Sequence, residues 1–409
     1  MLNAIWAFFF LAALVAGLAR WLLLGEPGVW QEMVGAAFEM SATAFEISLG
    51  LTGIMALWLG IMRLGEKGGL VQLLARAFRP LLTRLLRDVP PDHPAHGSIV
   101  MNMAANVLGL DNAATPLGLK AMRELQELNP DPDRATDAQI LFLVINTSSV
   151  TVVPVTIFTF RAQLGAADPT DVFLPILVAT YCSTLVGLLT VAAVQRLRLW
   201  DPVVLAYLGG LTALVGGLVA WFASMPEEQV APTSALLANL LIFLVIAAFL
   251  VAALLQRIPV YETFVEGAKD GFKVAVRIIP YLVGMLVAIG VFRASGALEF
   301  LLEGVRSAAA AAGVDTRWVD GLPTALMKPL SGSGARGMMV ETMTVHGADS
   351  FAGRLVSVMQ GSTETTFYVL AVYFGSVGVR RTRYAAACGL AADAAGVLAA
   401  ILVAYVFFG

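Results

Sequence analysis

Charge, cysteine and histidine are scarce in this chain of 409 residues. Charged residues make up 13% of it, against about 25% in soluble domains. The net charge is −3 and no basic tract lies outside the expected loops, so we expect no nucleic-acid partner. The two cysteines, Cys182 and Cys388, both lie in apolar runs, which argues against a disulfide framework and a thiolate metal site. We expect no resident metal.

Apolar sequence is abundant instead. Hydrophobic residues make up 58% of the chain, and the mean hydropathy is +0.81. Several runs exceed the roughly 18 apolar residues that span a bilayer. The first run, Leu2 to Leu24, has no basic segment before it and no small-residue cleavage site, so we interpret it as a retained helix. The sequence predicts an all-α polytopic membrane protein.

The apolar pattern predicts full crossings and two shorter helical hairpins. The crossings are expected near 3–24, 39–63, 137–160, 171–195, 202–224, 233–255, 274–294, 352–376 and 384–408. The hairpins are expected near 96–126 and 320–345, and each arm is too short to cross at about 1.5 Å per residue, so we interpret them as re-entrant. An amphipathic stretch expected to lie in the membrane interface precedes each hairpin, at Leu70–Val89 and Leu298–Ala312.

The order of these features occurs twice, near 35–165 and near 262–380. With the N-terminus inside, most basic residues fall on the cytoplasmic side, as the positive-inside rule requires. We therefore expect a multi-pass protein of the bacterial inner membrane with a cytoplasmic N-terminus. An odd number of predicted crossings begins between a position in the first repeat and the equivalent position in the second. Equivalent segments therefore cross the membrane in opposite directions, so the repeats are inverted. Inverted repeats with interrupted apolar segments indicate a solute site near the bilayer midplane.

The first hairpin carries amides and a carboxylate at its tip. Asn102 and Asn106 are four residues apart and share one helical face. Asp111 or Asn112 can cap the second arm, which continues through Thr115. One interpretation is that two half-helix ends meet at depth and direct backbone groups and amides at a substrate or ion. The alternative is that the amides only satisfy the interrupted backbone.

The second hairpin has the tip Ser331-Gly-Ser333-Gly and then Arg336. Its glycines permit close backbone approach, as in an anion-binding nest. Arg336 and Lys328 can hold an anionic group, but we favour an internal ion pair of Arg336 with Glu341 or Glu364. A Ser-Gly motif also occurs in intramembrane proteases, but all three histidines fall near loops or hairpin ends, so we expect no enzyme.

Two predicted crossings are interrupted by polar residues. The first polar run includes Asn146, Thr147, Ser148 and Thr151 and precedes Pro154, which removes a helix hydrogen bond. The second includes Gln360, Ser362, Thr363, Glu364 and Thr365. We predict that both runs contribute to a solute or ion site, with Glu364 binding Na⁺ or carrying a coupling proton. The alternative is that they hold helices together through hydroxyl hydrogen bonds.

Long motifs give the chain a family resemblance. Residues 1–200 resemble spore maturation protein A, through Gly109-Leu-Asp-Asn-Ala-Ala-Thr-Pro-Leu-Gly118 and Asn146-Thr-Ser. Residues 201–409 resemble spore maturation protein B, through Pro329-Leu-Ser-Gly-Ser-Gly334 and Gln360-Gly-Ser-Thr-Glu-Thr-Thr. The resemblance implies a nucleoside-recognition (Gate) domain in each half, similar to concentrative nucleoside transporters and to the membrane part of a ferrous iron transporter. The chain departs from these in lacking a Walker A motif and the nucleoside transporters' Asn-Glu motif.

These observations predict a secondary transporter or permease for a small polar solute. The only cofactor expected is Na⁺ or H⁺ as a coupling ion. The expected partners are the solute, membrane lipid and a second copy of the chain in a homo-oligomer. The alternative function is a membrane scaffold or assembly factor in envelope or spore maturation.

Overall fold

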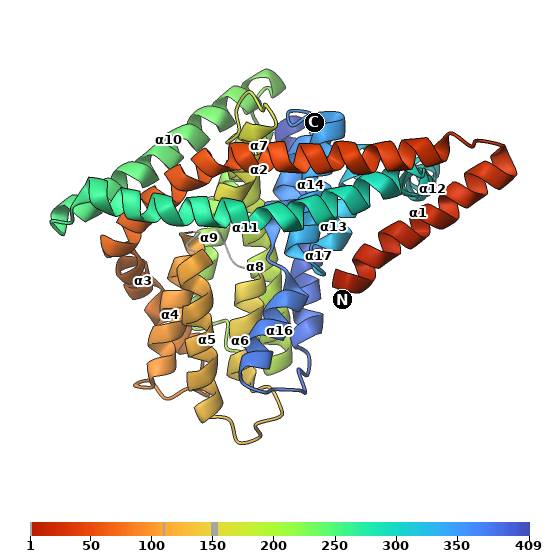
Figure 1. Ribbon diagram of the computed structural model, residues 1–409. Coiled ribbons are helices and arrows are strands. Elements are labelled where there is room, and N and C mark those ends of the chain that lie inside the picture. Colours follow the sequence, from red (N-terminus) through yellow and green to blue (C-terminus); the bar gives the residue numbers. More distant parts are fainter. Residues whose placement is uncertain (1, 109–110, 149–153) are drawn as a thin grey trace.

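The computed structural model describes residues 2–108, 111–148 and 154–409, and in these ranges regular structure is helical apart from one isolated bridge between Arg134 and Arg381. Figure 1 shows an upright bundle below two long helices that run across it. The helices of the first half are α1 (Leu2–Leu24), α2 (Val29–Lys67), α3 (Leu70–Leu85), α4 (Pro94–Val107), α5 (Asp111–Glu127), α6 (Asp137–Thr147), α7 (Val155–Gln163) and α8 (Phe173–Gln195). Those of the second half are α9 (Pro202–Ala223), α10 (Glu227–Leu255), α11 (Val260–Ala294), α12 (Ala297–Ala311), the 3₁₀-helix η1 (Arg317–Gly321), α13 (Leu322–Met327), α14 (Gly332–His346), α15 (Phe351–Ser362), α16 (Thr366–Ser376) and α17 (Ala385–Phe408).

The prediction of an all-α polytopic membrane protein is confirmed. In the described part of the chain, six helices are long and apolar enough to cross a membrane: α1, α2, α8, α9, α10 and α17. The end of α11 and α12 form one further apolar pair, bent by 67°. The predicted crossings at 137–160 and 352–376 are absent from this set because each is divided into two shorter helices. The predicted crossing at 274–294 is the second part of the longer α11.

Both predicted hairpins occur as helix pairs, α4 with α5 and α13 with α14. Both predicted breaks also occur. At the first, α6 ends at Thr147 with Ser148 as its C-cap, and α7 begins after its N-cap Pro154. The second lies at Thr363–Thr365, between α15 and α16. The two broken helices begin alike, because Thr136 caps α6 through Gln139 N–H and Ser350 caps α15 through Gly353 N–H. The amphipathic stretches form α3 and α12.

The helices α2 and α11 occupy equivalent places in the two repeats and pack closely side by side (Figure 1). A Cβ on Gly267 of α11 would lie 2.4 Å from the carbonyl oxygen of Leu59 in α2. Towards the other end of the crossing, a Cβ on Gly290 would lie 2.4 Å from Cγ of Met40. Gly290, late in α11, thus lies beside Met40, early in α2, and Gly267 lies beside the later Leu59. The two helices are therefore antiparallel, as inverted repeats require.

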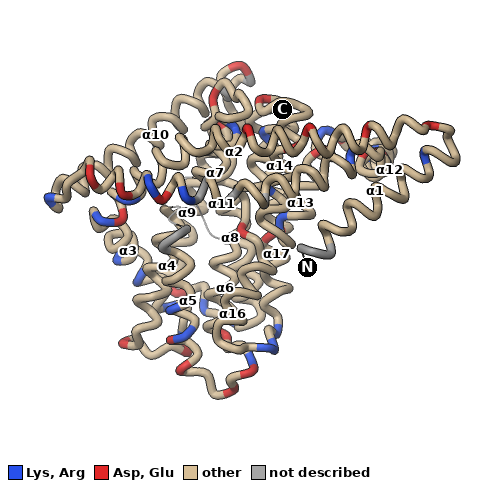
Figure 2. Tube along the Cα trace, in the orientation of Figure 1, with Lys and Arg blue, Asp and Glu red and all other residues tan. Residues whose placement is uncertain are grey.

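Charged residues concentrate at the loop ends and along the helices that run across the bundle (Figure 2). Near the beginning of α11, Lys67 and Arg63 of α2 both bind Glu266. Hydrogen bonds from Lys67 and then Arg63 lower the pKa of Glu266 to about 2. The middle of the bundle is largely uncharged, so the few buried ionisable groups there are prominent.

Candidate functional site

The tips of the hairpins and the breaks of the crossings meet inside the bundle. The backbone N–H of Glu364 in the second break donates to the carbonyl of Thr147 in the first, at 2.7 Å. Beyond the second break, Phe367 N–H donates to the carbonyl of Pro329 at the second hairpin tip, at 3.1 Å. The first hairpin joins the first break through Asn106 Nδ2, which donates to Asn146 Oδ1 at 2.8 Å. Four interrupted ends, two from each half, thus form one connected region, which we call the convergence site.

The first half supplies a chain of amides to the convergence site. Asn106 Nδ2 also lies 3.4 Å from Asn102 Oδ1, as the shared helical face predicts. The Asn102 amide donates to the carbonyl of Ala114, and the Asn146 amide donates to that of Phe142. Tyr373 of α16, which sequence reasoning missed, extends the chain because its hydroxyl lies near the Asn102 amide beside Gly118. The amides therefore both tie the broken backbone together and form a polar surface.

The second half supplies hydroxyl groups. Ser331 caps α14 by accepting from Gly334 N–H at 3.0 Å and lies 3.2 Å from the Ser333 hydroxyl. Ser362 donates to the carbonyl of Met359. Thr365 lies against the hairpin tip, where a Cβ on Gly332 would come within 2.8 Å of its hydroxyl. Ser331 and Ser362 thus have structural roles as well as a place in the site.

Some predicted site residues have polar atoms that are buried and uncommitted. Gln360 Oε1 and Thr363 Oγ1 have no hydrogen-bond partner within the described residues, although the two side chains are only 8% and 3% exposed. Glu364 is exposed, between the buried Thr363 and Thr365. The convergence site therefore presents an exposed carboxylate beside buried polar atoms that have no hydrogen-bond partner within the described residues.

A second carboxylate lies close by on α17. Asp393 is 2% exposed and accepts a hydrogen bond from the Thr366 hydroxyl at 2.6 Å. Thr363, Lys328 and Glu364 are near enough to interact with the same carboxylate. Asp393 stands alone in an apolar run of the sequence, and its unusual position was the only signal that pointed to it.

The predicted ion pair of Arg336 with Glu341 or Glu364 does not occur among the ion pairs of the described residues. Glu341 instead pairs with Arg293 of α11, in a two-point contact. Residues five positions apart in a helix are separated by about 140° around its axis, so the side chains of Arg336 and Glu341 point to different sides of α14 and cannot pair with each other. Thr115 lies partly buried on α5. Thr151 and the side chains of Asp111 and Asn112 lie outside the described residues.

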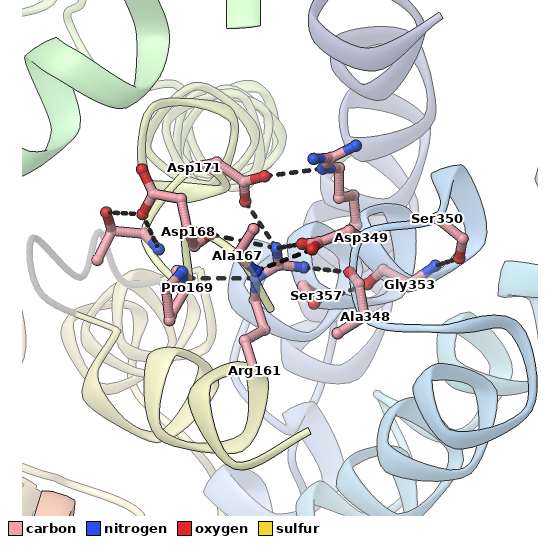
Figure 3. Close-up of polar contacts among 12 residues, drawn as sticks. Arg161, Ala167, Asp168, Pro169, Asp171, Ala348, Asp349, Ser350, Gly353 and Ser357 are labelled. Carbon is pink, nitrogen blue, oxygen red and sulfur yellow. Dashed lines mark hydrogen bonds and ion pairs between the residues drawn. The ribbon is translucent and has the colours of Figure 1, made fainter. Parts of the chain in front are cut away.

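Beyond the convergence site, a buried ion-pair cluster links the two halves (Figure 3). The Arg161 side chain, fully buried in the last turn of α7, contacts Asp171 at 2.8 Å and Asp349 at 3.2 Å. It also donates to the carbonyl of Ala348 at 2.7 Å. Arg354 of α15 binds the other oxygen of Asp171 at 2.7 Å. Burial raises the pKa of Asp171, and both guanidinium groups oppose that effect.

A related contact joins the halves at the opposite end of the bundle. Arg383, which follows the second broken helix, donates to the carbonyl of Ala135 and pairs with Asp137 at the start of the first. Beside it, Arg381 binds Asp131 through both carboxylate oxygens. An arginine at or just beyond the end of each broken helix thus contacts residues at or just before the start of the broken helix of the other half. We call these two contacts the Arg161 interlock and the Arg383 interlock.

The sequence was compared with known proteins. The model of the Gate family, described as nucleoside recognition, matches residues 48–164 and 275–380, together more than half of the chain. "Spore maturation protein B" of Bacillus subtilis (strain 168) is 50% identical over 166 residues, which are 41% of this chain and 92% of that protein. "Spore maturation protein A" of the same organism is 38% identical over 183 residues, 45% of this chain and 90% of that protein.

No solved structure matches the chain significantly. The family match falls in two stretches, and these contain the first hairpin with its broken helix and the second hairpin with its broken helix. The predicted resemblance is therefore confirmed, and the chain belongs to the nucleoside-recognition (Gate) family as a protein of the spore maturation A and B type.

Proposed function

We propose that this protein is a secondary transporter or permease for a small polar solute, which binds at the convergence site. The observation that carries the proposal is the contact of the two breaks, where Glu364 N–H meets the Thr147 carbonyl. Interrupted helices free backbone groups from their own hydrogen bonds, and in transporters such ends bind solutes and ions. A purely structural helix has no need of two breaks at one place, each of which costs several hydrogen bonds.

The chemistry of the site indicates the class of solute. Asn106 and Asn146 offer amides, and Thr363 and Gln360 offer buried oxygens without partners. Amides and hydroxyls bind by directional hydrogen bonds, and an unpaired buried group penalises any solute that cannot meet it. Glu364 adds one exposed negative charge. A neutral or cationic organic solute with several hydrogen-bonding groups fits this set best.

The two interlocks are suited to act as gates. They lie at opposite ends of the bundle, and each joins an arginine near the end of the broken helix of one half to residues near the start of the broken helix of the other. Opening one interlock while the other stays closed would expose the convergence site to one side of the membrane at a time. Rocking of one inverted repeat against the other is the usual form of such a motion. The described structure has both interlocks closed.

The proposal includes a location in the bacterial inner membrane with a cytoplasmic N-terminus. The support is the excess of basic residues in the loops on that side. The Arg383 interlock and the adjacent contact of Arg381 would then face the cytoplasm, and the Arg161 interlock would face the outside. Beside the Arg383 interlock lies a hollow of about 470 Å³ lined by Asp88, Asn129 and Asp137 among others, which would serve as a vestibule.

The test is a thermal-shift screen of small polar solutes on the purified full-length chain, followed by uptake of any active solute into proteoliposomes. A bound solute should stabilise the protein by about 2.7 kcal/mol at one hundred times its dissociation constant. Replacing Asn146 with alanine should abolish both stabilisation and uptake, because it removes the amide that joins hairpin and break. The control is Asn239→Ala, an exposed amide on α10 that bonds Asp168 and Thr170.

The names of the relatives favour one other function, a scaffold or assembly factor in spore maturation. In that case the polar breaks serve packing alone. No solute would stabilise the protein, proteoliposomes would take up no more solute than empty vesicles, and Asn146→Ala would act only on stability. Those three results together would exclude the transporter.

A further inference from the structure

We propose that the carboxylate of Asp393, with the hydroxyls of Thr363 and Thr366, forms a binding site for a monovalent cation, Na⁺ or a proton. Asp393 lies in the last helix, outside both polar runs that the sequence singled out. Its role as a coupling site rests on the proposed transport, but the binding itself does not.

The first argument is incomplete hydrogen bonding at a buried charge. The side chain of Asp393 is almost wholly buried. Its Oδ2 accepts from Thr366, whereas Oδ1 has no hydrogen-bond partner within the described residues. A buried carboxylate that lacks partners is costly unless a proton or cation compensates it. The Thr363 hydroxyl lies close enough to interact with this carboxylate, and it is also buried with no other hydrogen-bond partner in the described part of the chain.

The second argument is the close fit of α17 against the second break. Gly389 and Gly396 lie on either side of Asp393 along the helix and let the break approach. A Cβ on Gly396 would lie 2.6 Å from Thr363 Cγ2 and 3.2 Å from Ser362 Oγ, and one on Gly389 would lie 2.7 Å from Thr366 Cγ2. The glycines thus place hydroxyl oxygens of the break around the carboxylate.

The ligand chemistry selects the kind of ion. Carboxylate, hydroxyl and backbone carbonyl oxygens are hard ligands that suit alkali and alkaline-earth ions rather than soft metals. One carboxylate provides too little negative charge for a dehydrated divalent ion, and Lys328 adds a positive charge nearby. The charged groups that face Asp393 are Lys328, at the end of α13, and Glu364, in the break. Asp393, Glu364 and Lys328 together leave room for a single positive charge, which favours a monovalent cation.

The position of the site provides a coupling mechanism. Thr363, Glu364 and Thr365 form the break that contacts Thr147 and the second hairpin tip. A cation that draws the hydroxyls of Thr363 and Thr366 towards Asp393 would fix the break in the conformation that binds solute. Ion binding and solute binding would then favour each other.

The test measures the melting temperature of the detergent-solubilised full-length chain without any solute. One arm titrates Na⁺ at fixed pH with choline as the balancing ion, and the other varies pH in choline alone. We expect the melting temperature to rise with Na⁺ or to shift with pH, and we expect the Asp393→Asn variant to lose this response. Thr366→Val should weaken the response about 10–100-fold in apparent affinity, as loss of a supporting ligand does, and Thr366→Ser should restore it.

Controls separate binding from folding. Thr159→Val removes a fully buried hydroxyl that donates to the carbonyl of Val155 in its own helix, and it should leave the response unchanged. If neither Na⁺ nor pH shifts the parent chain, or if both Asp393→Asn and Thr366→Val retain the response, the site is refuted. A cation response without any solute uptake would instead refute only the transport proposal.

Discussion

Replacing Arg161 with alanine should destabilise the protein by about 3–5 kcal/mol, because it leaves buried charges without a partner. The Arg161 side chain has no exposed surface, and Asp171 beside it is 10% exposed. Without the guanidinium, Asp171 retains only Arg354, and the Ala348 carbonyl loses its donor. We expect a large fall in the melting temperature in detergent.

The matched control is Arg381→Ala at the other end of the bundle. Arg381 also joins the two halves, through Asp131, but its side chain is 62% exposed. An exposed ion pair contributes at most about 1 kcal/mol, so this variant should melt close to the parent. Equal melting temperatures for both variants would contradict the role assigned to burial. A selective effect of Arg381→Ala on transport would indicate a gate rather than a structural bond.

Replacing Gly267 with alanine should destabilise the crossing of α2 and α11 by about 1–3 kcal/mol, or more if the helices cannot separate. The added Cβ would lie 2.4 Å from the Leu59 carbonyl oxygen and 2.9 Å from Gly60 Cα. Both neighbours are backbone atoms, so no side-chain rotation relieves the contact. The expected result is a lower melting temperature and weaker contact between the two repeats.

Gly53→Ala is the matched control in the partner helix. A Cβ at Gly53 meets nothing within 4 Å. Alanine is favoured over glycine inside a helix by roughly 0.5–1 kcal/mol, so this variant should be neutral or slightly more stable. If Gly267→Ala is equally harmless, α2 and α11 do not pack as closely as described.

Much of the fold follows from the chain read as a pattern of apolar and polar segments. Proline removes a helix hydrogen bond and glycine permits tight turns, so Pro154 and the glycines near Ser331 marked real discontinuities, although Pro116 and Pro280 lie inside continuous helices. The caps Thr136 and Ser350 act within a few residues of their own positions, so local sequence determines them. Local rules also placed the amphipathic helices α3 and α12.

These local rules could not predict which residues far apart in the sequence form pairs. Nothing in the sequence near Glu341 shows that Arg293, rather than Arg336, would be its partner. Likewise Asp349 and Arg354 belong to the second half, yet they complete a cluster around residues of the first. In each case the partner is chosen by the docking of whole helices, which adds contacts between residues almost 200 positions apart.

The sequence by itself determined that the chain is a helical membrane protein, that its motifs occur twice, and where its helices are interrupted, because each of these depends on local composition. Only the tertiary structure decided that the four interruptions meet, that the oppositely directed α2 and α11 are in close contact, and that Asp393 lies beside the second break. The physical reason is that packing, hydrogen bonding and burial of charge depend on which surfaces meet, and local sequence does not specify the meeting of surfaces.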